Sequence, residues 1–130
     1  MPHAKGPFDV KLTPQQQAEG LGHGRMMLDK QFHGDLEAVS KGEMLAVRNM
    51  EHGSGVYVAI ERVAGTLAGR TGAFVLAHTG VMDRGAQDLR LFVSPDSGEG
   101  ELVGLRGEMK IIIADGSHSY EFDYELPASA

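Results

Sequence analysis

The sequence predicts an all-β protein that forms one closed antiparallel barrel of about eight strands. Three features predict this class: eighteen glycines, several short segments in which apolar and polar residues alternate, and no long segment with helical apolar spacing. Closure of the barrel removes exposed strand edges, and about eight strands leave room for packed side chains or one small ligand. A two-sheet β-sandwich is the alternative. A chain of 130 residues fits a single domain over residues 1–130.

The strands follow one another along the chain and are separated by turn residues. Alternation predicts strands over residues 4–12, 25–33, 36–50, 87–94 and 101–114. A loop insertion rich in Gln and Gly is expected at about residues 13–24, with one helical turn after Thr13 as an option. Within 36–50, the apolar residues change parity near Gly42, which predicts a bulge or kink there.

A long hairpin over residues 56–81 is the feature around which the other strands are arranged. Two runs rich in Val, Ile, Phe and Thr flank Ala68-Gly69-Arg70-Thr71. Glycine as the first of two turn residues suits a type II′ turn at Gly69-Arg70. In that register Glu61 faces His78 directly across the two strands. The same face carries Tyr57, Val63, Phe74 and Leu76, whereas Arg62 points to the other face.

The last hairpin has the strongest local signal. Asp115-Gly116 lies between two strand patterns and predicts a type I′ turn. Centring the turn there places Met109 opposite Phe122 inside, and Lys110 opposite Glu121 outside. In this register apolar residues face each other inside, and opposite charges face each other outside.

Composition and charge exclude several classes of function. A net charge of −6 and a pI near 5.4 argue against nucleic acid or an anionic membrane as a partner. The absence of Cys excludes disulfides and thiol chemistry, and neither a signal peptide nor an apolar membrane span is visible. We therefore expect a cytoplasmic protein. The six histidines are scattered and no glycine run opens a helix, so neither a metal site nor a cofactor is expected.

Three segments resemble a known bacterial family. They are E-R-V-A-G-T-L-A-G-R-T-G-A-F-V-L-A-H-T-G (Glu61–Gly80), S-G-E-G-E-L-V-G-L-R-G-E (Ser97–Glu108) and F-H-G-D-L-E (Phe32–Glu37). In order and spacing they resemble the family called domain of unknown function 3224. The resemblance spans most of the chain and implies a small barrel of the allene oxide cyclase-like type. It implies no biochemical role and supplies no catalytic residues.

Glu61 and His78 are the candidate catalytic residues. A carboxylate beside an imidazole fixes the tautomer of the imidazole and raises the basicity of the imidazole. Such an imidazole suits the role of a general base near neutral pH. The structural alternative is a cross-strand ion pair that satisfies two polar groups. If their face lines the barrel, Tyr57 is the nearest assisting group. If the opposite face lines it, Arg62 points inward instead and needs an acidic partner.

Three functions follow from these residues. The first is a barrel that binds a small apolar ligand in its interior; the candidate ligand-binding residues are Tyr57, Phe74, Leu76 and Arg62. The second is an isomerase, cyclase or hydrolase that uses Glu61 and His78. The third is a filled barrel that acts through its surface as a homo-oligomer, and we expect self-association in any case.

Overall fold

The computed structural model describes residues 2–15 and 23–127, and within these ranges the chain forms nine β-strands and no helix. The strands are β1 (His3–Gln15), β2 (Gly24–Phe32), β3 (Leu36–Asn49), β4 (Ser54–Leu67), β5 (Arg70–Asp83), β6 (Ala86–Val93), β7 (Glu99–Gly100), β8 (Arg106–Ala114) and β9 (Ser117–Glu125). Across the described residues, no helix has the length and apolar character needed to cross a membrane.

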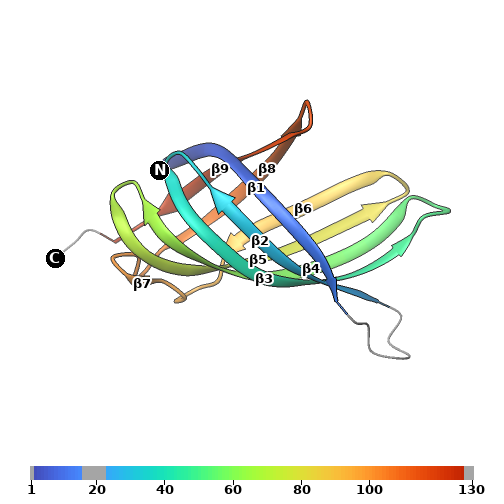
Figure 1. Ribbon diagram of the computed structural model, residues 1–130, viewed down its shortest axis with the longest axis horizontal. Coiled ribbons are helices and arrows are strands. Elements are labelled where there is room, and N and C mark those ends of the chain that lie inside the picture. The colour runs from blue at the N-terminus through green and yellow to red at the C-terminus, as the bar shows by residue number, and fades with distance from the viewer. Residues whose placement is uncertain (1, 16–22, 128–130) are drawn as a thin grey trace.

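Eight strands close an antiparallel ring in the order β1–β2–β3–β4–β5–β6–β8–β9, with β9 returning to β1 (Figure 1). The short β7 lies outside the ring and pairs with the start of β5 at Gly72 and Ala73. The predicted barrel is therefore confirmed, and the β-sandwich alternative is wrong.

Three expectations about individual segments need correction. β1 continues through Gln15, so residues 13–15 belong to a strand that pairs with β2 and not to the expected loop or helical turn. Residues 16–22 of that loop lie outside the described residues. β3 contains no bulge, because its one-to-one pairing with β2 and β4 runs through Gly42 without interruption. Residues 101–104 form turns, so the expected strand over 101–114 begins at Arg106.

The central hairpin turns one residue earlier than predicted. Ala68 and Gly69 are the turn residues, with φ angles of 48° and 86°, the positive pair of a type I′ turn. Glu61 consequently opposes Leu76, and His78 opposes Ala59. The predicted pairing was wrong by two positions. Because side chains alternate with a period of two, this shift leaves every residue on its predicted face.

The last hairpin has the predicted register. Met109 pairs with Phe122, and Lys110 pairs with Glu121. Asp115 and Gly116 have φ angles of 52° and 77°, as a type I′ turn requires. The Asp-Gly signal was therefore sufficient to fix this register from the sequence.

The barrel interior has two different halves. The closed half is packed with aromatic and aliphatic side chains around Phe32, Phe74, Tyr120 and Phe122, all nearly inaccessible to solvent. Leu102 and Leu105, from the segment between β7 and β8, belong to the same core and cover this end. The open half lies toward the turns at residues 50–53, 84–85 and 115–116, where Leu28, Met44 and Ala59 form a smaller cluster.

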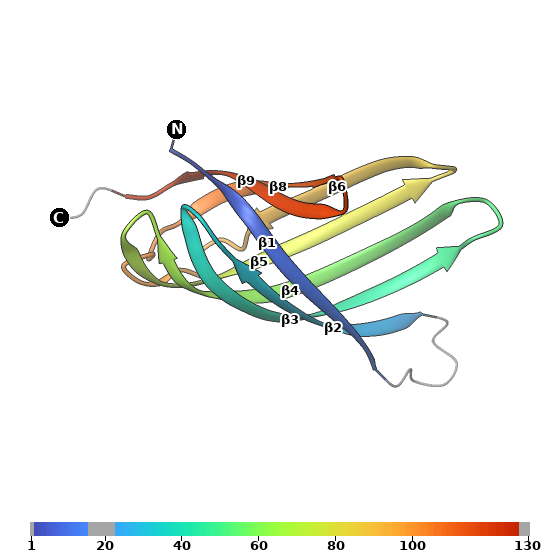
Figure 2. The ribbon, with the colours of Figure 1, turned by 45° about the horizontal axis from the view of Figure 1, so that its top comes forward.

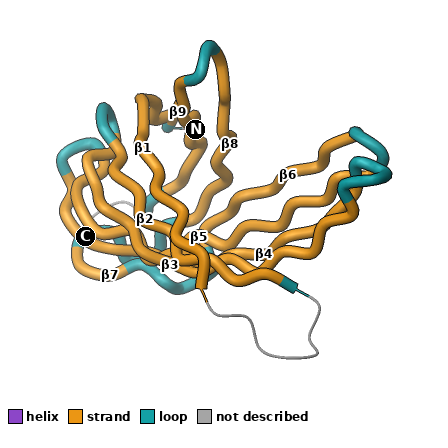
Figure 3. The backbone as a smooth tube through the Cα atoms, turned by 45° about the vertical axis from the view of Figure 1, so that its right-hand side comes forward, coloured by secondary structure: helices purple, strands orange, loops and turns teal. Residues whose placement is uncertain are grey.

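The ring is loosest between β6 and β8. These strands pair at only two positions, Leu91 with Met109 and Phe92 with Glu108. Beyond this point the β8–β9 hairpin diverges from the tips of β5 and β6 (Figure 3), whereas β3, β4, β5 and β6 continue side by side (Figure 2). The open half is therefore bounded mainly by β1 to β6 and is accessible at its end.

Candidate functional site

A buried carboxylate lies at the boundary between the two halves. Glu61 on β4 is fully buried, and three side chains from three other strands contact it. Lys30 Nζ on β2 donates to Oε2 at 2.8 Å, and Ser40 Oγ on β3 donates to Oε1 at 2.7 Å. His78 Nε2 on β5 lies 2.5 Å from Oε2. Glu61 thus joins β2, β3, β4 and β5 through one polar cluster, which we call the Glu61 cluster (Lys30, Ser40, Glu61 and His78).

The partners of Glu61 keep it ionised. Burial by itself raises the pKa of this carboxyl group, but the contacts with His78 and Lys30 outweigh burial and lower the pKa from 4.5 to about 2. A group with that pKa neither gives nor takes a proton at neutral pH. In any acid–base chemistry Glu61 would therefore position its neighbours, and His78 would be the group that exchanges a proton.

A glycine opposite Glu61 makes this arrangement possible. Gly42 on β3 pairs with Glu61, and a Cβ atom at position 42 would lie 2.1 Å from the Ile60 carbonyl oxygen and 2.6 Å from Glu61 Cα. β3 and β4 therefore approach more closely here than a side chain at position 42 would permit. Pairing with β2 and β4 nevertheless continues through Gly42.

His78 lies between Glu61 and the open half. Its side chain is 5% exposed, and Nε2 makes no hydrogen bond of acceptable angle despite its distance of 2.5 Å to Glu61. The contact is therefore an electrostatic one between an imidazole and a carboxylate. The sequence placed these two residues together correctly, although the register brings them into diagonal rather than direct opposition.

Lys30, like Ser40, is a member of the cluster that we did not predict. Its side chain is 6% exposed, and Nζ lies 5.5 Å from the centre of the Phe8 ring and 5.8 Å from that of Phe32. Such cation–π contacts compensate part of the cost of removing an ammonium group from water. The sequence did contain a signal, because Lys30 falls between Leu28 and Phe32 on the apolar face of its strand, where a charge needs a partner.

Tyr57 forms part of the wall beside His78. Its ring centre lies 6.4 Å from that of His78, in an edge-to-face arrangement. The ring also lies across β5 at Gly80, where an added Cβ would be 2.1 Å from the Tyr57 Cε1 atom. Burial, and then the nearby Glu61 carboxylate, raise the pKa of Tyr57. Its hydroxyl group therefore stays protonated at neutral pH and is able to donate a hydrogen bond.

A cavity of about 190 Å³ lies next to the cluster in the open half. Lys30, His78 and Tyr57 form its polar side, and His118 lies among its lining residues. The remaining lining residues are apolar: Phe8, Val10, Leu12, Leu28, Met44, Leu89, Ile111 and Ile113. An apolar wall with a few polar groups at one side is the usual character of a small-molecule site.

The other candidate residues lie elsewhere. Phe74 and Leu76 point inward but belong to the closed half, where Phe74 stacks on Phe122 with ring centres 5.9 Å apart. Arg62 points outward, and its Nη2 atom lies 2.9 Å from Glu99 on β7. Arg62 is therefore outside the barrel, and none of these three side chains lines the cavity. Among the described residues no cluster of His, Asp or Glu has the arrangement of a metal site.

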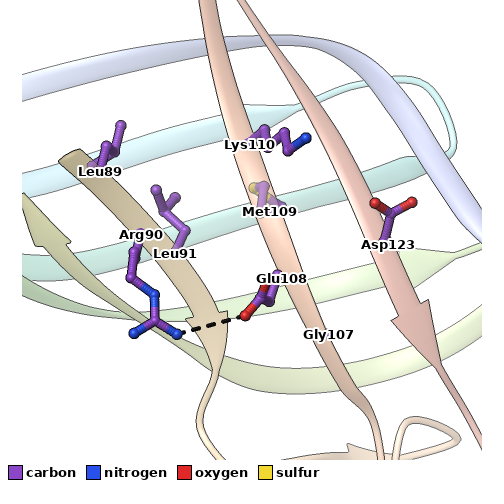
Figure 4. A pocket seen from close by; sticks show the side chains of 8 residues that line it. All are labelled: Leu89, Arg90, Leu91, Gly107, Glu108, Met109, Lys110 and Asp123. Carbon is purple, nitrogen blue, oxygen red and sulfur yellow. Dashed lines mark ion pairs between the residues drawn. The ribbon is translucent and has the colours of Figure 1, made fainter. Parts of the chain in front are cut away.

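A second pocket of about 330 Å³ occupies the loose seam between β6 and β8 (Figure 4). Its charged rim includes Arg90 and Glu108, which form an exposed ion pair at 3.6 Å. Leu89 and Met109 form part of its apolar lining, and Leu89 also lines the interior cavity. Leu89 is therefore common to the linings of both pockets.

Comparisons with known proteins identify one family. The family described as protein of unknown function (DUF3224) matches residues 4–124. A crystal structure of a protein of unknown function from this family, from Shewanella oneidensis MR-1, is 51% identical, covers 99% of each chain and has a TM-score of 0.92. No curated protein matches the chain. The allene oxide cyclase-like description of the barrel stays a prediction.

Proposed function

The chain belongs to the family of proteins of unknown function DUF3224, and from its interior we propose that it binds a small, largely apolar molecule inside the barrel. The observation that carries this proposal is the cavity in the open half, which has apolar walls and a buried polar group at one side. A filled barrel would place packed side chains here, as the closed half does around Phe74 and Tyr120.

The contrast between the two halves supports binding over a purely structural role. Large apolar side chains such as Leu12 and Leu89 point inward yet remain 47% and 42% exposed. Where apolar surface is exposed in a concave site, binding of an apolar ligand removes apolar surface of both partners from water, which lowers the free energy. The Glu61 cluster would then fix the orientation of the bound molecule.

An acid–base enzyme is the second candidate, and the His78–Glu61 contact favours it. His78 would exchange the proton, Glu61 would hold the imidazole, and Tyr57 would donate a hydrogen bond to a substrate oxygen. His78→Ala tests this role once a converted molecule is known. If turnover survives this substitution in a folded protein, the catalytic role of His78 is excluded while ligand binding stands.

Native mass spectrometry of the protein purified from its own cells tests the binding proposal. We expect a mass above the denatured mass, because a retained molecule is released on unfolding. Val10→Phe fills the cavity from its wall and should abolish the extra mass, whereas Val39→Phe, at a half-exposed position on the outer face, should retain it. Extra mass that persists in Val10→Phe would place the molecule elsewhere and overturn the proposal.

A further inference from the structure

The ionisable residues that line the interior cavity include basic side chains but no acidic ones. Lys30, Tyr57, His78 and His118 line it, and no Asp or Glu is among its described lining residues. Glu61 lies behind Lys30 and His78, and both of its oxygens are already occupied by the cluster. The side of the cluster that faces the ligand therefore presents hydrogen-bond donors and positive charge.

Lys30 has donor capacity beyond its bond to Glu61. An ammonium group has three N–H donors, and among the described residues Nζ makes one hydrogen bond, to Glu61 Oε2. Its other near neighbours are the rings of Phe8 and Phe32, which accept no conventional hydrogen bond. His78 Nε2, in contrast, lies against Glu61 Oε2. The buried Lys30 ammonium thus adjoins the cavity with unused capacity to donate, an arrangement that is costly unless an acceptor engages it.

We infer that the molecule bound in the cavity is an amphipathic monocarboxylate, with its apolar chain along the aliphatic wall and its carboxylate against Lys30 and His78. This inference rests on the proposed function and names the chemical class of its ligand. Charge-assisted hydrogen bonds from the ammonium and imidazole groups hold the carboxylate head. A cationic ligand is disfavoured, because no accessible carboxylate lines the cavity to receive it.

Charge balance gives His78 a specific part in binding. Lys30 and Glu61 already neutralise each other, so a second carboxylate beside them needs a second positive charge. The imidazole of His78, which lines the cavity together with Lys30, is the basic group placed to accompany that carboxylate.

Isothermal titration calorimetry with octanoate and octanamide tests the inference, because the two probes differ only in the head group. We expect octanoate to bind the wild-type protein at least tenfold more tightly at pH 6.5.

Variants assign the effect to the cluster. Lys30→Met leaves Glu61 buried without its ammonium partner, so the double variant Lys30→Met/Glu61→Gln, which removes both charges, is the primary test. It should bind octanamide as the wild type does and lose the tenfold preference for octanoate. His78→Asn should reduce the preference for octanoate, and His118→Asn, at the other histidine of the cavity, should retain it.

The outcomes separate the inference from the proposed function. Equal binding of octanoate and octanamide to the wild type overturns the inference and leaves the apolar site intact. A preference for octanoate that survives in the double variant also overturns it, because the head group then binds elsewhere. Failure of both probes to bind would contradict the proposed function itself.

Discussion

Substitution of Glu61 by Gln should produce a loss of stability that depends on pH. The carboxylate is fully buried, and the surrounding cluster lowers its pKa from 4.5 to about 2. At about 1.4 kcal/mol for each pH unit, the ionised form contributes roughly 3 kcal/mol to the free energy of unfolding at pH 7. Glutamine keeps the shape of the side chain and removes this contribution.

The direction of the pH dependence follows from the lowered pKa. A carboxyl group whose pKa is lower in the folded state stabilises the protein above its unfolded pKa of about 4.5, and this stabilisation disappears as the pH falls through about 2. The wild type should therefore exceed Glu61→Gln by roughly 3 kcal/mol at pH 7. Between pH 5 and pH 3 that difference should shrink by about 2 kcal/mol, because Glu61 becomes protonated in the unfolded chain while it stays ionised in the folded protein.

Urea unfolding followed by circular dichroism at pH 7, 5 and 3 measures this difference; fluorescence is less suitable because the chain has no Trp. Glu43→Gln is the control, since Glu43 forms an exposed pair with Arg25 and should change stability by less than about 1 kcal/mol at each pH. A Glu61→Gln protein as stable as the wild type at pH 7, or a difference that stays constant down to pH 3, would refute the reasoning.

Three further substitutions have expected outcomes. Gly42→Ala places a Cβ against the backbone of the neighbouring strand and should reduce stability by about 3 kcal/mol in thermal unfolding. Gly24→Ala, whose Cβ would lie 3.9 Å from the Ala46 carbonyl oxygen at ordinary contact distance, should stay within about 0.5 kcal/mol. Gly80→Ala displaces the Tyr57 ring and should weaken binding of octanamide several-fold in calorimetry while the fold persists; unchanged affinity would remove Tyr57 from the site. Arg62→Ala loses an exposed ion pair and should change stability by less than about 1 kcal/mol and leave binding unaltered; weaker binding would contradict its placement outside the barrel.

The alternation of residues predicted the faces of the strands better than their pairing. Tyr57, Glu61 and His78 were correctly placed on one face, because parity depends only on position along the strand. The pairing failed because Ala68 adopts a positive φ angle of 48°, a conformation that alanine rarely takes and that costs about 1 kcal/mol. The sequence therefore favoured the turn that starts on Gly69.

Tertiary contacts account for the features that the sequence did not reveal. Residues 101–105 have strand-like alternation, but Leu102 and Leu105 instead turn into the closed half and cover its end. The role of Lys30 depended on contacts with Glu61 and Phe8, which lie on other strands. On β3, the apolar Leu45 and Val47 are half-exposed on the outer face, and they produced the false change of parity near Gly42. The expected homo-oligomer stays a prediction.

The central claim is that a small apolar molecule occupies the open half, and the methionines of the chain provide a direct measurement. Met44 lines the cavity, Met109 lies in the closed half at 3% exposure, and Met50 is 81% exposed at a distant turn. Titration of methyl-labelled protein with octan-1-ol, followed by NMR, should shift the Met44 methyl signal and leave those of Met50 and Met109 in place. A shift confined to Met50, or no shift at saturating probe, would contradict an interior binding site.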